Sequence, residues 1–359
     1  MPAPGGAGDP RPGEAREGWH SLGDVPDLPE TVVYRTRLTT RFRGLDARDG
    51  VLLRGAAGWG EFSPFWDYDD AESAAWLRAA HEAAHEGWPD PVRDAVPVNV
   101  TVPAVGPERA RAIVEASGGC RTAKVKVAQR GPDGTLETLA DEVARLEAVR
   151  DALGPGGAVR VDANGAWDVE DALRRLPHLD RAAGGLEYVE QPCADVAGLA
   201  AVRRGQHGDT AVPVAADESV RRAEDPLAVV RAEAADVVVL KVQPLGGVRA
   251  CLELAERVGL PVVVSSALES SVGIAAGVAL AAALPDLPYA CGLATVQLLA
   301  QDPTDAPLLP VDGALRVARP VPSPARLAAT APDPVTDRRW RDRLDRVAAL
   351  AGGAAEAAR

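Results

Sequence analysis

The chain has 359 residues, of which 47% are hydrophobic and 25% are charged, and its formal net charge is -13. This composition is typical of globular proteins and excludes wholesale disorder. The excess of acidic residues argues against nucleic-acid binding, because neutralising phosphates requires clustered Lys and Arg. The length exceeds that of one ordinary hydrophobic core, so we expect a large barrel or two domains.

The N-terminal third predicts a small α+β domain. Residues 1–28 are rich in Pro and Gly and are expected to form a flexible leader. Residues 31–43 and 51–60 are typical of strands, and residues 70–86 of a helix that ends before Gly87. Five aromatic residues lie between Trp59 and Tyr68, and they form either a small local core or an apolar loop that closes over a ligand. We assign residues 29–95 to this domain.

From residue 98 the pattern changes to short apolar runs that alternate with helical segments. The starts of the runs are about 25 to 35 residues apart, which is the repeat of a β-α unit, so eight units predict a closed (β/α)-barrel over residues 96–307. The runs are residues 98–102, 123–127, 158–162, 186–190, 212–218, 236–241, 261–266 and 289–293.

The residues after the barrel are expected to form a strand, a linker and a helix, and we assign no chemistry to the C-terminal tail. Residues 308–319 are expected to include a last strand that returns to the N-terminal domain, and residues 320–359 a Pro-rich linker and a charged helix.

The four cysteines form no CxxC pair, so we expect buried, inert thiols. The first 30 residues contain no apolar run typical of a signal peptide or membrane span, which favours the cytoplasm and argues against membrane binding.

Acidic residues end three successive predicted strands. Asp162, Glu190 and Asp217 stand at these ends. Because the carboxyl ends of barrel strands meet at one face, their carboxylates should converge there. Clustered carboxylates repel one another unless a cation neutralises them, and an all-oxygen ligand set favours Mg²⁺, with Mn²⁺ as a substitute.

Lysines flank these carboxylates on both sides. Lys124 and Lys126 lie on one face of the second strand, and Lys241 ends the sixth. Lys126 is the candidate general base, because an adjacent cation and a metal would lower its pKa. Lys241 is either a second acid/base or a fixed cation. A single acid at a strand end would be unremarkable, but this ordered set over five strands indicates a catalytic site.

The segments AKVKV, VDANGAW, YVEQP, ADES and LKVQPLGG resemble the enolase superfamily, in its muconate-lactonizing-enzyme-like branch. The resemblance covers about residues 31–317. Within that branch the chain is similar to the o-succinylbenzoate synthase family of actinobacterial type. That similarity rests on GEFSPF, RVDANGAW, EQP, SSALESSVG and the GL pair at residues 292–293. It implies a (β/α)₇β barrel with an N-terminal α+β capping domain.

The resemblance also implies an activity: syn dehydration of 2-succinyl-6-hydroxy-2,4-cyclohexadiene-1-carboxylate, a small dicarboxylate, to 2-succinylbenzoate in menaquinone biosynthesis. By position, Lys126 would move the protons, Lys241 would stabilise the enediolate, and Glu218 would support the Mg²⁺ ligands without binding the ion. The residues implied to face or support the substrate are Lys124, Arg160, Asn164, Ser265, Ser266 and Gly292. We therefore predict a pocket of positive local charge, opposite to the charge of the whole chain. The segment that closes the site in relatives is not evident, since the leader shows no clear strand.

Three alternatives stay open. Relatives that racemise N-succinylamino acids or epimerise dipeptides keep the same acids and lysines. The segment HEAAH at residues 81–85 has the form of a zinc-protease motif, with Glu82 as the base. No third ligand follows it, so we expect a surface helix of the capping domain. A barrel that has lost catalysis is the third alternative, but none of the core positions is missing.

Overall fold

A computed structural model describes residues 30–130, 135–206, 211–223 and 225–357. The predicted leader, residues 1–28, lies outside the described residues. The chain enters the fold through an antiparallel sheet of β1 (Thr31–Phe42), β2 (Leu45–Gly55) and β3 (Gly58–Phe62). The prediction of one strand over residues 51–60 is wrong, because the chain turns at residues 56–57 and splits this segment between β2 and β3.

The predicted helix after the aromatic loop is confirmed. A capping box between Asp69 and Glu72 starts α1 (Asp70–His81), which satisfies its first free backbone amides. The helix continues as the π-helical turn η1 (Glu82–Glu86) and ends at Gly87, whose φ of 73° suits glycine. The expected extent of residues 70–86 is therefore correct, although its last turn is not α-helical.

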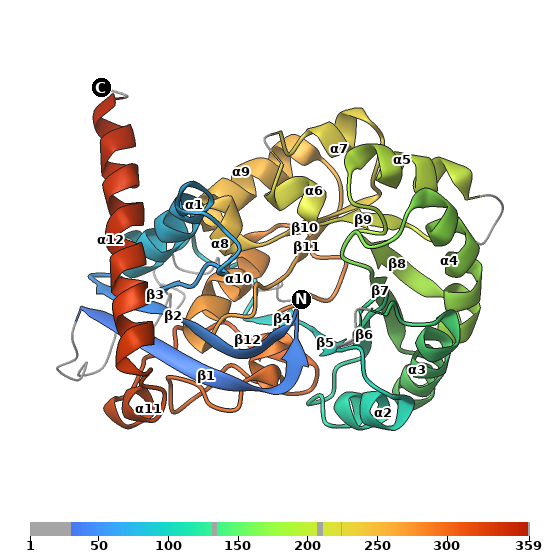
Figure 1. Ribbon diagram of the computed structural model, residues 1–359, viewed down its shortest axis with the longest axis horizontal. Helices are drawn as coiled ribbons and strands as arrows, with labels where there is room; N and C mark the ends of the chain where they lie inside the picture. Colours follow the sequence, from blue (N-terminus) through green and yellow to red (C-terminus); the bar gives the residue numbers. More distant parts are fainter. Residues whose placement is uncertain (1–29, 131–134, 207–210, 224, 358–359) are drawn as a thin grey trace, which may run out of the picture.

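The barrel wall consists of parallel strands in the order β11-β10-β9-β8-β7-β6-β5. Figure 1 shows helices around the outside of these strands. The strands are β5 (Asn99–Val102), β6 (Thr122–Lys126), β7 (Ala158–Asp162), β8 (Leu186–Glu190), β9 (Val214–Ala216), β10 (Val237–Leu240) and β11 (Val262–Val264). The helices that follow them are α2 (Pro107–Glu115), α3 (Leu139–Leu153), α4 (Val169–Ala183), α5 (Val196–Gly205), α6 (Glu218–Arg221), α7 (Ala228–Arg231), α8 (Val242–Leu245), α9 (Val248–Val258), α10 (Ser271–Ala283) and η2 (Ala294–Leu298). The predicted barrel class is confirmed.

The barrel closes through two residues of the segment predicted as an eighth strand. Cys291 accepts a hydrogen bond from Asn99 N at 2.9 Å, and Gly292 donates from its N to Val264 O at 2.8 Å. In the described structure this segment joins the barrel wall through isolated bridges: Cys291 bridges Val98, just before β5, and Gly292 bridges Ser265, just after β11. A Cβ on Gly292 would lie 2.6 Å from Ser265 Oγ, so only glycine fits this seam without a shift.

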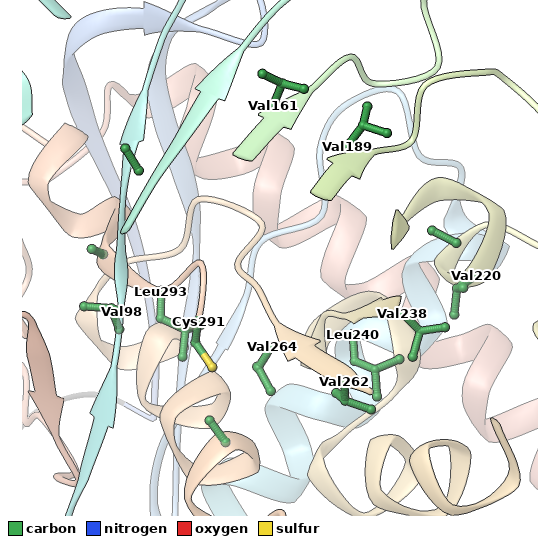
Figure 2. Close-up of a cluster of buried hydrophobic side chains, with 14 of the residues drawn as sticks. Val98, Val161, Val189, Val220, Val238, Leu240, Val262, Val264, Cys291 and Leu293 are labelled. Carbon is green, nitrogen blue, oxygen red and sulfur yellow. The ribbon is translucent and has the colours of Figure 1, made fainter. Parts of the chain in front are cut away.

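Side chains on the strands alternate between two environments. Val161, Val189, Leu240 and Val264 point outward and join the core between strands and helices, where Cys291 also lies (Figure 2). Residues one position away point inward. This alternation explains why the charged residues of adjacent strands meet inside the barrel.

The segments after the barrel pack against elements from the N-terminal part of the chain. Of the strand expected within residues 308–319, β12 (Ala314–Arg316) forms, and it pairs with β4 (Ala95–Pro97). The stretch expected as a linker contains α11 (Pro324–Ala329), and α12 (Pro334–Ala357) packs against α1 and β1 (Figure 1). Trp340 and Val347 of α12 are fully buried, as their spacing along one helix face predicts.

Candidate active site

The three predicted carboxylates lie side by side at the carboxyl ends of their strands. Asp162 ends β7 and pairs in register with Glu190 at the end of β8, while Asp217 follows β9 directly. Each of the three is at most 1% exposed. Burial of three neighbouring carboxylates is costly unless cations lie close to them.

Lysine side chains supply these cations. Lys124 Nζ lies 2.7 Å from Glu190 Oε1 and 3.1 Å from Asp162 Oδ2. Lys126 Nζ lies 2.6 Å from Asp162 Oδ2, and Lys241 Nζ lies 2.6 Å from Asp217 Oδ2. Two lysines therefore reach the carboxylates from β6, and a third reaches them from the end of β10.

The chain contains no other lysine: three of its 39 basic Lys and Arg residues are Lys, and all three lie at this site. Arginine stays protonated at all physiological pH values, whereas a buried lysine can lose its proton and act as a base. In a chain that uses arginine everywhere else, lysine at these three positions indicates a need for an amine. This count is a sequence signal that our motif analysis missed.

The carboxylates differ in proton affinity. Burial and the neighbouring Asp162 raise the pKa of Glu190 to about 7. Burial would also raise the pKa of Asp162, but Lys126 and Lys124 outweigh it and hold that pKa well below its ordinary value. Burial lowers the pKa of Lys241, in spite of Asp217 beside it. The site thus combines a carboxyl group whose pKa is raised with an amine whose pKa is lowered.

The donor chemistry fits a hard divalent cation. Among the residues that the structure describes, no three His, Cys, Asp or Glu side chains are gathered as ready ligands, and Lys124 bridges two of these carboxylates, Asp162 and Glu190. The raised pKa of Glu190 shows that further positive charge would be favourable here. Asp162, Glu190 and Asp217 offer only oxygen atoms, which Mg²⁺ and Mn²⁺ prefer.

A cavity opens directly beside these groups. All three lysines and Asn164 line it from the barrel. Ser265, Ser266 and Gly292 line it from the seam where the barrel closes. The structure therefore brings all but one of the predicted substrate-facing residues to one cavity.

Arg160 is the exception. It lies two residues below Asp162 on β7, fully buried, and donates to Glu187 Oε2 at 2.5 Å and to Ala290 O at 2.7 Å. Its guanidinium also stacks over the ring of Tyr188. Arg160 thus fills the barrel interior beneath the site and does not line the cavity. The spacing of two residues predicted the correct face of the strand but not the depth.

Glu218 lies beside the carboxylates. Its Oε1 accepts from Arg221 Nη2 at 2.5 Å and from Asn164 Nδ2 at 3.3 Å. Arg221 is a residue that the sequence analysis missed: its Nε lies 2.9 Å from Asp217 Oδ1, and its Nη1 donates to the Tyr68 hydroxyl. The available signal was its position, one helical turn after Asp217.

The N-terminal sheet supplies the roof of the cavity. Phe42 and Arg43, at the tight turn between β1 and β2, line the cavity together with Phe65 from the aromatic loop. Arg43 and Gly44 turn the chain with φ values of 51° and 75°. The leader, in which no closing segment was evident, lies outside the described residues; within them this turn lies over the cavity. The aromatic loop serves both predicted purposes, since Phe65 belongs to a local core and faces the cavity.

The acidic side chain of the segment HEAAH is held by contacts with the barrel. Glu82 is buried and accepts hydrogen bonds from Val248 N at 2.5 Å and from Arg249 N at 3.1 Å, so its carboxylate caps the start of α9. His81 and His85 are exposed and stack on each other at 4.3 Å. The expected surface helix is therefore correct for the histidines but wrong for Glu82, which joins the N-terminal region to the barrel.

No helix within the described residues is long and apolar enough to cross a membrane.

The arrangement defines an enzyme site in which three buried carboxylates pair with lysines, and these lysines line a roofed cavity at the mouth of a barrel. Family models agree: residues 33–84 match the enolase N-terminal domain-like model, and residues 107–322 match the enolase C-terminal domain-like model.

Curated relatives refine this class. The chain is 65% identical to an o-succinylbenzoate synthase of Thermobifida fusca, over 86% of this chain and 92% of the relative. It is 51% identical to an o-succinylbenzoate synthase of Mycolicibacterium smegmatis, over 90% and 96%. The chain therefore belongs to the o-succinylbenzoate synthase family of the enolase superfamily. The predicted family and the prediction of a hydro-lyase are confirmed, and the racemase alternative is not favoured.

Solved structures share the fold. A muconate lactonizing enzyme from Pseudomonas fluorescens, complexed with muconolactone, superposes with a TM-score of 0.70 at 24% identity and covers 84% of this chain and 97% of its own. The L-Ala-D/L-Glu epimerase from Bacillus subtilis gives a TM-score of 0.64 at 21% identity, over 82% and 96%. At such identities the likeness supports the barrel with its N-terminal domain and no particular substrate.

Proposed function

We propose that this chain dehydrates 2-succinyl-6-hydroxy-2,4-cyclohexadiene-1-carboxylate to 2-succinylbenzoate, as a step of menaquinone biosynthesis. The observation that carries the proposal is the placement of all three lysines of the chain around one cavity, in a sequence 65% identical to a synthase of this name. A small dicarboxylate suits a cavity whose wall and roof present Lys124, Lys126, Lys241 and Arg43.

Lys126 is the proposed acid/base. Its neutral amine takes the α-proton of the substrate, and the electron pair of the broken C–H bond moves into the adjacent carboxylate. The resulting ammonium then gives its proton to the departing hydroxyl as the C–O bond breaks, so water leaves and an aromatic ring forms. Donation to both Asp162 and Asn164 orients the Lys126 amine toward the cavity.

Lys241 is the proposed counterion on the facing wall. It pairs with Asp217 and lines the cavity, where its charge would stabilise negative charge that develops on the substrate carboxylate. Asp162, Glu190 and Asp217 would hold Mg²⁺, with Mn²⁺ as a substitute. When bound, the cation would neutralise the same developing charge. A related fold, the dipeptide epimerase of Enterococcus faecalis, is described as complexed with Mg and a dipeptide.

We propose the cytoplasm as the compartment. Cys120, Cys193, Cys251 and Cys291 are buried free thiols. Burial raises the pKa of each thiol, to about 11 for Cys193 and Cys291, which keeps these groups protonated and unreactive. Unpaired cysteines are typical of reducing compartments.

The direct test offers the purified protein the cyclohexadiene substrate with Mg²⁺ and follows its absorbance. A parallel assay offers N-succinyl amino acids and follows optical rotation. Turnover of the first substrate supports the proposal. Turnover of N-succinyl amino acids alone would replace it with the racemase function, and inactivity toward both would reject it.

A further inference from the structure

The helix after the barrel packs directly against the loop that roofs the cavity. Trp340 of α12 is fully buried and lies edge-on to Phe62, with ring centroids 6.0 Å apart. It also lies 4.5 Å from the ring of Trp66 in the aromatic loop. Figure 1 shows α12 running alongside α1, on the side of the molecule away from α3 and α4. The helix therefore supports the roof from outside the barrel.

One arginine of this helix binds the loop along its backbone. The guanidinium of Arg343 donates to Pro64 O at 3.2 Å, to Phe65 O at 3.1 Å and to Tyr68 O at 2.6 Å. It also donates to Ser73 Oγ at 2.9 Å, at the start of α1. Arg343 is only 2% exposed, so these neutral acceptors replace its water. A planar group with several donors fixes the relative positions of all four acceptors.

The side chains of the same loop point into the site. Phe65 lines the cavity, and the guanidinium groups of Arg43 and Arg48 each lie 4.5 Å from the centroid of its ring. The Tyr68 hydroxyl accepts from Arg221, which in turn binds Asp217. The backbone that Arg343 holds thus carries one side chain of the roof and one partner of the carboxylate site.

We propose that Arg343 is a positioning residue for the dehydration: it fixes the backbone of residues 64–68, so that Phe65 closes the cavity and Tyr68 meets Arg221. This inference rests on the proposed function. Arg343 touches neither the cavity nor the carboxylates, and it acts on both through the loop. We predicted no chemical role for α12 from the sequence, but through Arg343 this helix helps to position the residues of the site.

The test compares Arg343→Met with Arg341→Met on the same helix. Arg341 is half-exposed, and within the described chain its one ion pair is with Asp337 on the same helix. The Arg341 variant therefore controls for general effects of a substitution in α12. Displacement of the roof should weaken substrate binding, and a shift of about 1 Å at a site can cost up to about 100-fold. We expect Arg343→Met to raise KM about tenfold or more, with a smaller fall in kcat. Arg341→Met should leave both values unchanged.

Hydrogen exchange supplies a readout that does not depend on turnover. In Arg343→Met, the amides of residues 64–68 should exchange faster while those of the barrel strands stay unchanged. Arg343→Lys can satisfy only some of the four acceptors and should restore KM in part. If Arg343→Met does not fold, Arg343→Lys and Ser73→Ala carry the test, with smaller increases in KM.

Unchanged KM and unchanged exchange in folded Arg343 variants would overturn the inference. A lower melting temperature with unchanged KM would assign Arg343 to stability alone, which also overturns it. Failure of the wild-type protein to dehydrate the substrate would reject the proposed function instead. The exchange comparison would still report whether Arg343 holds the loop.

Discussion

Lys126 Nζ lies 2.6 Å from Asp162 Oδ2, and the two side chains face each other from adjacent strands of the barrel. Lys124 Nζ approaches the same oxygen at 3.1 Å from the same strand as Lys126. The proposed base therefore shares a carboxylate with a second lysine. Removing Lys126 leaves Asp162 with a cation, so the fold should tolerate its loss.

Lys126→Ala should abolish measurable dehydration while the protein stays folded. Loss of a general acid/base typically lowers kcat by about 10²- to 10⁴-fold. Circular dichroism and thermal melting check the fold, and steady-state assays check the rate. Near wild-type activity in this variant would contradict the proposed mechanism.

Mg²⁺ should stabilise the wild-type protein and not an Asp162→Asn variant. A ligand at about 100 times its Kd adds about 2.7 kcal/mol to the free energy of unfolding. Calorimetric titration and thermal melting, each with and without Mg²⁺, measure this effect. Asp168→Asn is the matched control: Asp168 is exposed and caps α4, a position that asparagine also fills well. Equal stabilisation of both variants would argue against a metal site at Asp162.

Lysine-selective ¹³C labelling should give only three side-chain signals, because the chain has three lysines. We expect Lys241 to titrate below its ordinary pKa of 10.5, since burial disfavours its charged form. The signal of Lys124 should titrate above that value, since Glu190 and Asp162 outweigh its burial. Nuclear magnetic resonance of the protein at increasing pH measures both. The opposite order would contradict the electrostatic description of the site.

Glu269 should make the protein less stable as the pH rises from about 5 to 8. Burial and the nearby Glu61 raise the pKa of Glu269 to about 7 from an ordinary value of 4.5. The folded state therefore binds more protons than the unfolded state between these values, so stability is lost as the pH increases through this window. A shift of this size corresponds to about 3 kcal/mol at pH 8.

Glu269→Gln mimics the protonated side chain and should remove the part of this pH dependence that belongs to Glu269, while Glu190, whose pKa is also raised to about 7, keeps its own part. Its side-chain oxygen can still accept from Ala267 N, which lies 2.8 Å from Glu269 Oε2. Urea unfolding at pH 5 and pH 8 measures the difference, and Glu256→Gln at an exposed site serves as the control. If Glu269→Gln kept the full pH dependence, the buried proton would belong to another group.

The barrel and its carboxylates could be predicted because period-two alternation and strand ends are local properties of the sequence. Asp162 and Glu190 end apolar runs, and the register of parallel strands then places them together. The depth of Arg160 could not be predicted in this way, since it depends on where Glu187 and Ala290 lie in the closed barrel.

The other differences between prediction and structure come from packing between residues that are far apart in the sequence. Nothing near Glu82 in the sequence shows that its carboxylate meets the start of α9, 166 residues later. Likewise, the roles of Arg221 and Arg343 depend on Tyr68 and on its loop, which become their neighbours only in the folded chain. Short motifs identify chemistry at strand ends, but they do not identify the partners that hold a roof in place.

The contact between α12 and the roof loop also sets an order of events during synthesis. The strands of the barrel and the seam at Gly292 leave the ribosome before Arg343 does, so the wall can close while the roof still lacks its last partner. A nascent chain would then have its lysines and carboxylates in place before it could hold a substrate firmly. The roof loop would gain its contacts with Arg343 only after every strand of the barrel has been made.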